Sequence, residues 1–407
     1  MLDIVVGAQV GDEGKGRIVH NLSLQNDVVA GVRAQGGNNA GHTVMHEGRT
    51  YKLHLVPSSV VARKPGYLGR GMLVDIAVLA EDIEKNGFIS RTICVDPYVH
   101  LIMPWHKELD SINETQQGIF AAGSTRRGIA PAYGAKHERF GVRLDDLMRG
   151  DERIDVYSNF FAHRIAPFVS TPVRDLVKGF KQDIEKMRSV AGILPAQVKD
   201  VSSLVEEHLQ NGHHVIGEAA QGYMLDVHHA DYPFVTSCGT GAAAMWEGIG
   251  LGPRKEYMGE VIGVAKVYTT KVGNGNFPSE IHDSRAEELR LKGGEYGTTT
   301  GRARRIGWFD VDMVKGSVRH SGLTQLALTK LDVLGGMDEI KMRPLEKSFQ
   351  GWPVFSSEEY REQLDAGIDY VSDNNLRAYL QEIREKVGVP IGMVTFGQDS
   401  KDFISYL

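Results

Sequence analysis

Short runs of apolar and β-branched residues alternate with amphipathic helical segments along this 407-residue chain. Strand-like runs lie at residues 2–8, 28–34, 51–56, 214–217, 261–270, 326–331 and 391–395. Parallel strands are joined by crossover helices, and these helices cover both faces of their sheet. The alternation therefore predicts an α/β protein, a single large body whose mainly parallel, twisted central sheet is covered by helices.

Helix boundaries are marked at several positions. Asp75 can cap a helix whose apolar residues follow the i, i+3, i+4, i+7 spacing and which ends at Gly87. Thr171 and Pro172 supply a cap and a first-turn proline for a second helix, and a third covers residues 201–209. No repeat, low-complexity tract or linker divides the chain. We therefore expect one domain over residues 1–407, with helical and loop insertions around 100–210 and 270–310.

Composition excludes several classes of protein. With 46 Lys+Arg against 52 Asp+Glu, the net charge is −6, so no overall basic field exists to bind nucleic acid or an anionic membrane. No apolar run approaches the roughly 18 residues that span a bilayer. The two cysteines, Cys94 and Cys238, lie outside any C-x-x-C spacing, which favours a reducing compartment over a disulfide framework or a zinc ribbon. We therefore expect a cytoplasmic protein without a nucleic-acid or membrane partner.

Residues 11–16 form a glycine loop between the first predicted strand and the first predicted helix. Its glycines expose backbone amides, the helix N-terminus adds partial positive charge, and Lys15 adds a full one, as phosphate binding requires. The loop departs from the common G-x-x-x-x-G-K-[ST] pattern because Gly16 replaces the hydroxyl residue that ligates magnesium. Asp12 is therefore a candidate either for holding a metal ion or for acting as a base.

Two further segments favour nucleotide binding over a surface turn, which is the alternative for a glycine loop taken alone. Residues 36–43 place three glycines and two asparagines at a predicted strand end, where His42 can donate to a phosphate or protonate a leaving group. Residues 329–332 resemble the N/T-K-x-D element that reads guanine in GTP-binding proteins. Its carboxylate, here Asp332, accepts from the guanine N1–H and exocyclic amine, a pair of donors that adenine lacks.

Other segments concentrate groups that bind anions. Residues 298–305 combine threonines and arginines, which suits bidentate capture of a carboxylate or phosphate, although a solvated basic turn has the same composition. Residues 123–128 are a second candidate anion site, and Gln221 with residues 232–237 could hold a polar heterocycle. Two adjacent histidine pairs lack metal-ligand spacing, so we expect surface or strand positions rather than zinc for His213, His214, His228 and His229.

Taken together, these segments resemble the adenylosuccinate synthetase family of purine-pathway ligases. The match runs through residues 11–16, 39–43, 128–133, 232–237, 299–302 and 329–332 and ends near Gly397, so it covers essentially the whole chain. The resemblance implies a cytoplasmic homodimer that joins IMP to L-aspartate. GTP would be the co-substrate and Mg²⁺ the cofactor, one ion per subunit. The products would be adenylosuccinate, GDP and phosphate, formed through a 6-phosphoryl-IMP intermediate.

The resemblance also implies roles for individual residues. Asp12 would take the N1 proton of IMP and, with the Gly41 carbonyl, hold Mg²⁺, while Lys15 and His42 would neutralise the transferred phosphoryl group. The purine monophosphate would contact Asn39, Thr125, Gln221, Thr236, Val272 and Arg302, with Arg139 reaching it from the other subunit. Aspartate would contact Thr299, Thr300, Arg302 and Arg304. GTP would contact Gly11, Glu13, Gly14, Lys15, Gly16, Gly41, His42, Thr43, Lys330, Asp332, Thr395 and Gly397.

Some residues around the expected substrate site depart from the family pattern. Val10 stands where the family usually has Trp, and Asn38 where His is common. This drift admits a second hypothesis, because phage relatives of the family join dGMP to aspartate on the way to diaminopurine DNA. Those relatives replace the Asp of the phosphate loop, whereas Asp12 is kept here, so IMP ranks first. A GTP-binding protein without ligase activity is the remaining alternative, but it leaves His42 and residues 299–305 unexplained.

Overall fold

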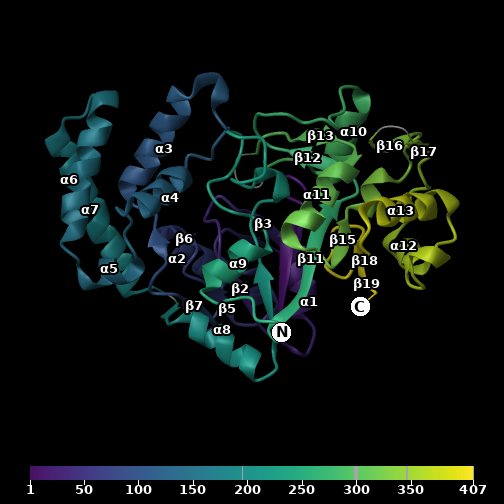
Figure 1. The fold of residues 1–407 in the computed structure, drawn as a ribbon, viewed down its shortest axis with the longest axis horizontal. Coiled ribbons are helices and arrows are strands. Elements are labelled where there is room, and N and C mark those ends of the chain that lie inside the picture. Colours follow the sequence, from purple (N-terminus) through teal and green to yellow (C-terminus); the bar gives the residue numbers. More distant parts are fainter. Residues whose placement is uncertain (195, 298–300, 345–346, 407) are drawn as a thin grey trace.

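A ten-stranded sheet runs through the middle of the molecule (Figure 1). The computed structural model describes residues 1–194, 196–297, 301–344 and 347–406, and within them the strand order is β19-β18-β15-β11-β1-β10-β2-β5-β7-β9. Neighbouring strands are parallel except β18 and β19 at one edge, so the predicted mainly parallel sheet is confirmed. The strands are β1 (Leu2–Gly7), β2 (Val28–Arg33), β5 (Gly66–Leu68), β7 (Ile93–Val95), β9 (Gln197–Val198), β10 (His214–Glu218), β11 (Met258–Lys266), β15 (Gln325–Thr329), β18 (Ile391–Thr395) and β19 (Phe403–Ser405).

Helices cover both faces of this sheet, as the apolar pattern of its strands requires. In β1, Leu2, Ile4 and Val6 belong to one buried cluster, whereas Val5 belongs to another that contains Ile18 of helix α1. Successive side chains of a strand point to opposite faces, so each face has its own apolar layer. The helices are α1 (Lys15–Ser23), α2 (Ile76–Asn86), α3 (Pro104–Gln116), α4 (Ile129–Glu138), α5 (Leu144–Arg149), α6 (Arg153–Ile165), α7 (Val173–Gly192), α8 (Val201–Gln210), α9 (Ala242–Ile249), α10 (Ser284–Gly293), α11 (Val311–Ser321), α12 (Ser357–Leu364) and α13 (Asn374–Val387).

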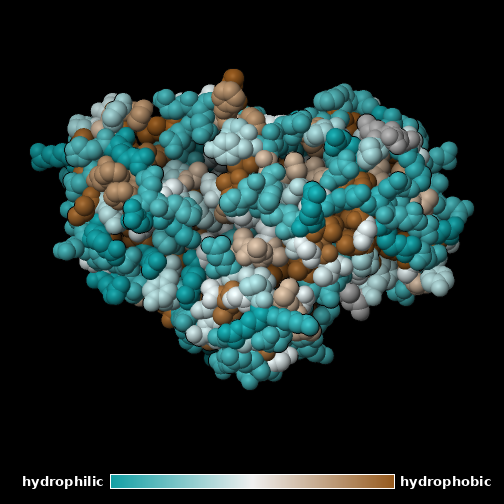
Figure 2. Space-filling view, in the orientation of Figure 1, coloured by the Kyte–Doolittle hydropathy of each residue, from teal (hydrophilic) through white to brown (hydrophobic). Residues whose placement is uncertain are grey.

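A second apolar cluster lies among helices α2 to α7, on the left in Figure 1. Trp105 of α3 stacks on Phe161 of α6 at 5.3 Å between ring centroids and meets Phe180 of α7 edge to face. Aromatic pairs at this distance add to the free energy gained by burying their surface. The outer surface in Figure 2 is mostly hydrophilic, with apolar residues in separate groups. None of the helices in the described ranges is long and apolar enough to cross a membrane.

Short sheets flank the central one and carry several loops of interest. An antiparallel hairpin follows the second glycine-rich loop, and another pairs the two ends of the segment around residues 272–304. These strands are β3 (His42–His46) with β4 (Arg49–Leu53), β12 (Thr269–Lys271) with β13 (Arg305–Gly307), β6 (Leu73–Val74) with β8 (His100–Leu101), and β14 (Phe309–Asp310) with β16 (Ile340–Arg343) and β17 (Lys347–Phe349).

Several predicted element boundaries were wrong. The run at 261–270 forms two strands. The side-chain amide of Gln9 donates hydrogen bonds to the carbonyl oxygens of Lys266 and Tyr268, and β11 therefore ends at Lys266. The run at 51–56 stops at Leu53, because the amides that follow donate to the Asp82 carboxylate. Helix α7 begins after an N-cap at Pro172, without the side-chain cap expected from Thr171. The Asp75 cap is confirmed, since its carboxylate accepts from the amides of Ala77 and Val78.

Polar side chains gather where the sheet strands end. Arg33 ends β2, Glu218 ends β10, Lys266 ends β11 and Thr329 ends β15, and all four are buried. The carboxyl ends of parallel strands lie along one edge, where α/β sheets bind their ligands. The topology therefore places the glycine loop after β1 beside these polar residues.

Helix α9 approaches the backbone after β2 so closely that only glycine fits at Gly248. A Cβ added there would lie 1.8 Å from the Ala34 carbonyl oxygen. We expect Gly248→Ala to lower the free energy of unfolding by about 2 kcal/mol or more, because the helix must move away from a well-packed backbone. Gly252→Ala is the control, since nothing lies within 4 Å of its added Cβ. Urea unfolding of both variants checks this, and equal stabilities would contradict it.

Candidate active site

A cavity of about 850 Å³ opens at the carboxyl edge of the sheet. It is lined by the glycine loop, by the loop after β2, and by segments around residues 122–137, 221–237 and 293–304. The structure brings most of the predicted site residues to this one cavity. They are Gly11, Asp12, Gly14, Lys15, Gly16, Asn39, Gly41, His42, Thr43, Thr125, Gln221, Thr236, Val272, Arg304, Lys330 and Gly397.

Five of the predicted residues that the structure describes are not among those that line the cavity. Thr299 and Thr300 lie outside the described residues. Glu13 and Thr395 are buried behind the cavity wall, and Asp332 is partly buried in the 3-10 helix η6 (Leu331–Leu334). Arg302 is exposed, and a Cβ added at Gly123 would lie 3.9 Å from its Nη1 atom. Arg139 is exposed at the C-cap of α4, away from the cavity of its own chain.

The glycine loop is held in shape by a buried carboxylate. Gly11, Asp12 and Gly14 have φ angles of 88°, 59° and 97°, a left-handed path that is unusual for a residue with a side chain such as Asp12. Glu13 accepts hydrogen bonds from the amides of Gln9 (3.2 Å) and Gly11 (2.7 Å) and pairs with Lys15 at 2.6 Å. Glu13 therefore supports the loop from behind, and its side chain is not placed to contact a nucleotide in the cavity.

Asp12, which is exposed to the cavity, lies at the end of a chain of buried charges. Its carboxylate lies 2.9 Å from one nitrogen of Arg304, whose other nitrogen lies 2.5 Å from Glu295. Glu295 also pairs with Lys266 at 2.8 Å. Burial alone would raise the pKa of Glu295, but Lys266 and Arg304 lower it to about 2. Burial lowers the pKa of Lys266 to about 8 in spite of Glu295. The chain fixes the position of Arg304 and presents it to Asp12.

His42 is oriented by a second buried carboxylate. Its Nδ1 atom lies 2.6 Å from Oε1 of Glu218, which is fully buried and also accepts from the amide and hydroxyl of Ser58, each at 2.7 Å. Burial opposes the charged form of Glu218, yet the facing His42, with Arg33 behind it, lowers its pKa to about 2. The ionised Glu218 therefore fixes the ring and leaves Nε2 as the nitrogen available to a ligand.

The predicted anion site at residues 123–128 is filled by a carboxylate of the protein itself. Glu114 accepts hydrogen bonds from the amides of Gly123 (2.7 Å) and Ser124 (2.9 Å). Asp110 accepts from the Gly128 amide at 2.8 Å. Glu114 and Thr125 both line the cavity. In this structure the amides of the segment therefore bind carboxylates of the protein itself.

Several buried polar atoms in and beside the cavity have no hydrogen-bond partner among the described residues. They include Oδ1 of Asn39, Oε1 of Gln221, Oδ1 of Asp332 and Oγ1 of Thr395. An unpaired buried polar atom is costly, and native proteins retain one where a ligand or water completes it. All four belong to residues that the sequence predicted as nucleotide contacts. They fall into two groups, one near residues 39 and 221 and one near the ends of β15 and β18.

Comparison with known proteins agrees with this geometry over nearly the whole chain. The family model of adenylosuccinate synthetase matches residues 4–404. The adenylosuccinate synthetase of Desulforamulus reducens is 37% identical over 97% of this chain and 96% of its own length, and that of Carboxydothermus hydrogenoformans is 39% identical with the same coverage. The chain belongs to the adenylosuccinate synthetase family. It is therefore a ligase of the type predicted from the motifs.

Solved structures give the same fold. The fully ligated adenylosuccinate synthetase of Plasmodium falciparum matches with a TM-score of 0.84 and 30% identity over 99% of both chains. The succinoaminodeoxyadenylate synthetase of cyanophage S-2L, bound to dGMP and dATP, matches with a TM-score of 0.67 over 100% of this chain and 95% of the phage chain. Its identity is 19%, so that likeness concerns the fold alone.

Sequence reasoning missed the charged residues that support this synthetase-type site from behind. Glu218, Lys266 and Glu295 are buried and hold His42 or Arg304 in place. A usable signal existed for the first two, because each is a charged residue that ends its strand directly after a run of apolar residues and glycine. Glu295 has no such signal, since its partners lie in other segments and only the fold brings them together.

The acid sensitivity of this protein should depend on Glu218. Its pKa is about 2 in the folded chain against an ordinary value of 4.5. The stabilisation is therefore complete above pH 4.5 and is lost as the pH falls towards 2, and it amounts to roughly 3 kcal/mol. We expect Glu218→Gln to flatten the fall in unfolding free energy between pH 5 and pH 3, measured by urea titration. Glu84→Gln, at an exposed position, should leave the slope of the wild type; equal slopes in both variants would contradict the assignment.

Proposed function

We propose that this chain joins IMP to L-aspartate at the expense of GTP, with the individual residues acting in the roles given below. The observation that carries the proposal is the pattern of unpaired buried polar atoms. Asn39 and Gln221 supply them on one side of Asp12, and Asp332 and Thr395 supply them near the predicted guanine element. Two nucleotides, one beside each group, would donate hydrogen bonds to these oxygens, with the triphosphate lying along the glycine loop between them.

Asp12 is the proposed base. The 6-oxo group of IMP is a poor leaving group, so it must first become a phosphate ester. Asp12 takes the N1 proton, O6 forms a bond to the γ-phosphorus, and the bond from that phosphorus to GDP breaks. The aspartate amine then bonds to C6, phosphate leaves with the C6–O bond, and the amine loses its proton. Lys15 and His42 line the same cavity and supply positive charge to the transferred group.

Arg304 links aspartate binding to the freeing of Asp12. It pairs with Asp12 at 2.9 Å and lies in the segment predicted to bind the substrate carboxylates. A substrate carboxylate that binds Arg304 takes the place of Asp12 in its ion pair with the guanidinium. Glu295 keeps Arg304 in position throughout, because it holds the other nitrogen. The proposed order of events is that aspartate engages Arg304 while Asp12 turns to the purine.

Magnesium fits the donor set at the glycine loop. Asp12 and Gly41 both line the cavity and offer a carboxylate and a carbonyl oxygen, the hard ligands that Mg²⁺ takes together with water and phosphate oxygens. When bound, the ion would neutralise charge on the β and γ phosphates. Arg139, exposed at the end of α4, is the residue we propose to reach the nucleotide of a second subunit in a homodimer.

A substrate matrix tests the proposed activity. We expect phosphate release from the purified protein only when GTP, IMP, L-aspartate and Mg²⁺ are all present, with a product that absorbs as adenylosuccinate. Release with dGMP but not with IMP would replace IMP by the phage-type substrate. Release with GTP alone would indicate a GTPase and not a ligase.

Asp12→Asn is the matched variant for this assay. It keeps the shape of the side chain but cannot accept the N1 proton, so turnover should fall by about 10³-fold or more while GTP still binds. Retention of turnover by this variant would contradict the role of Asp12 as base.

The guanine element gives a separate prediction. Asp332→Asn should lower kcat/KM for GTP by about 100-fold, because the amide cannot accept from both the N1–H and the exocyclic amine. Xanthosine triphosphate carries an oxygen in place of that amine, so the variant should use it better than the wild type does. The KM for IMP should not change. An unaltered preference for GTP would show that Asp332 does not read the base.

A further inference from the structure

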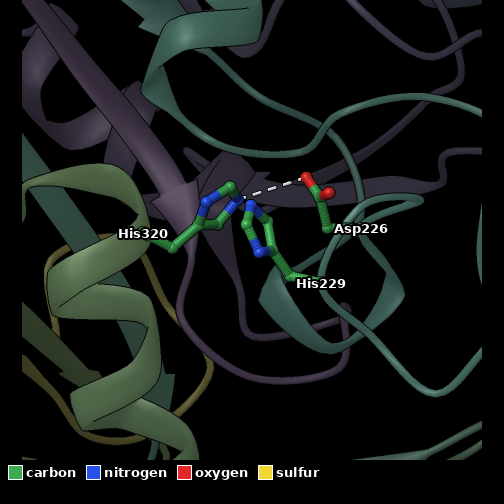
Figure 3. Close-up of side chains that lie close together, drawn as sticks. All are labelled: Asp226, His229 and His320. Atoms are coloured by element: carbon green, nitrogen blue, oxygen red, sulfur yellow. Dashed lines mark hydrogen bonds and ion pairs between the residues drawn. The ribbon is translucent and has the colours of Figure 1, made fainter.

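Three metal-binding side chains meet on the far side of the cavity wall. Asp226 follows the 3-10 helix η5 (Tyr223–Leu225), His229 lies in the next turn, and His320 lies in the last turn of α11. Figure 3 shows the carboxylate and the two imidazole rings converging. One ligand atom from each residue lies within 4.8 Å of the other two. Asp226 is fully buried, whereas His229 is exposed, so an ion can reach the group from solvent.

The distances match those of a tetrahedral site. Nε2 of His320 lies 3.2 Å from Oδ2 of Asp226. Two ligands bound at 2.0–2.1 Å to a tetrahedral ion are roughly 3.3 Å apart. The distance between His320 and Asp226 therefore already suits two ligands of one tetrahedral ion. The rings of His229 and His320 lie 4.2 Å apart between centroids, and His229 is on an exposed turn. The ligand atom of His229 lies within 4.8 Å of the other two, so binding an ion would require these two distances to shorten to roughly 3.3 Å.

The surroundings of Asp226 hold its carboxylate in one orientation. Asp226 accepts from the His228 amide (2.8 Å) and the Thr240 amide (2.6 Å), which fix the direction of its carboxylate. Hydrogen bonds of this kind orient metal ligands. The neighbouring Gly241 leaves room for the imidazole, because a Cβ there would lie 2.9 Å from Nε2 of His320. Its φ of −87° suits any residue, so space and not backbone conformation requires glycine.

We propose that Asp226, His229 and His320 bind one divalent transition-metal ion of the zinc class. Two imidazoles and one carboxylate favour Zn²⁺ over Mg²⁺, which prefers an all-oxygen octahedron. Three protein ligands leave a fourth position for water or an external group. This site is separate from the proposed magnesium position at Asp12 and Gly41, and it uses a histidine that the spacing in the sequence did not associate with a metal.

The ion would link residues 225–240, part of which line the cavity, to the end of α11. Leu225 and Val227, on either side of Asp226, line the cavity, and the Thr236 amide donates to the Leu225 carbonyl at 2.8 Å. The Asp226 carboxylate points the other way, towards α11. Metal binding therefore joins residues 225–240 to the end of α11 from the outside of the cavity, without entering it.

The ordinary alternative is an Asp226–His320 hydrogen bond with an adjacent imidazole and no metal. Equilibrium dialysis separates the two, using the full-length protein, ZnCl₂ and excess MgCl₂, with bound zinc measured by mass spectrometry. We expect about one Zn²⁺ per chain, with affinity at least 10-fold lower in His229→Ala and in His320→Ala. His228→Ala is the matched control, because this adjacent histidine contributes only its backbone amide to Asp226. Asp226 itself is not varied, since the change would also release the Thr240 amide.

Two further measurements keep the test decisive. A second histidine pair, His20 and His46, has ring nitrogens 3.2 Å apart, so His46→Ala shows whether zinc binds there instead. Co²⁺ should give the intense visible bands of a four- or five-coordinate ion in the wild type and in His228→Ala, and lose them in His320→Ala. Unchanged melting temperatures without metal show that the variants are folded. Absence of zinc binding, or equal binding by His320→Ala and the wild type, would overturn the proposal.

Discussion

The site depends on the hydrogen bonds and the ion pair of the buried Glu13 carboxylate. A charge removed from water is tolerated only when its oxygens are fully hydrogen bonded. One oxygen of Glu13 accepts hydrogen bonds from two loop amides, and the other pairs with the Lys15 ammonium. The chain comes so close to it that a Cβ at Gly7 or Gly222 would lie 2.7 Å or less from its oxygens. These contacts fix the left-handed path of the loop and hold Lys15 and Asp12 at the cavity.

The structure satisfies its reactive charges internally. Lys15 contacts Glu13 and the Gln221 carbonyl, Asp12 contacts Arg304, and Glu114 takes the amides of the anion loop. Each pair joins a group expected to bind substrate with a group of opposite character from the protein. Under the proposed function, a bound substrate would replace one of these internal partners. Glu295 and Glu218 lie behind the cavity and would keep Arg304 and His42 in place during that exchange.

The sequence predicted the elements whose cause is local. Asp75 caps α2 as expected, and β18 has the predicted bounds, because capping and apolar runs are properties of adjacent residues. The residues of the glycine loop other than Glu13 line the cavity, because a loop that follows a strand of a parallel sheet begins at the carboxyl edge, where such sheets bind ligands. The break after Lys266 was not predictable, since it depends on the amide of Gln9, which is distant in the chain. Likewise, His320 showed no sign of its neighbours until the fold placed α11 against the turn that carries Asp226.

Glu114 competes with any external anion for amides within residues 123–128. A phosphate gains the amides of Gly123 and Ser124 only by displacing a carboxylate that is covalently part of the chain and always present at high local concentration. Under the proposed function, a nucleotide would do so because its purine and ribose bring contacts of their own. Free sulfate or inorganic phosphate brings no such contacts, so Glu114 would exclude these small anions by competition.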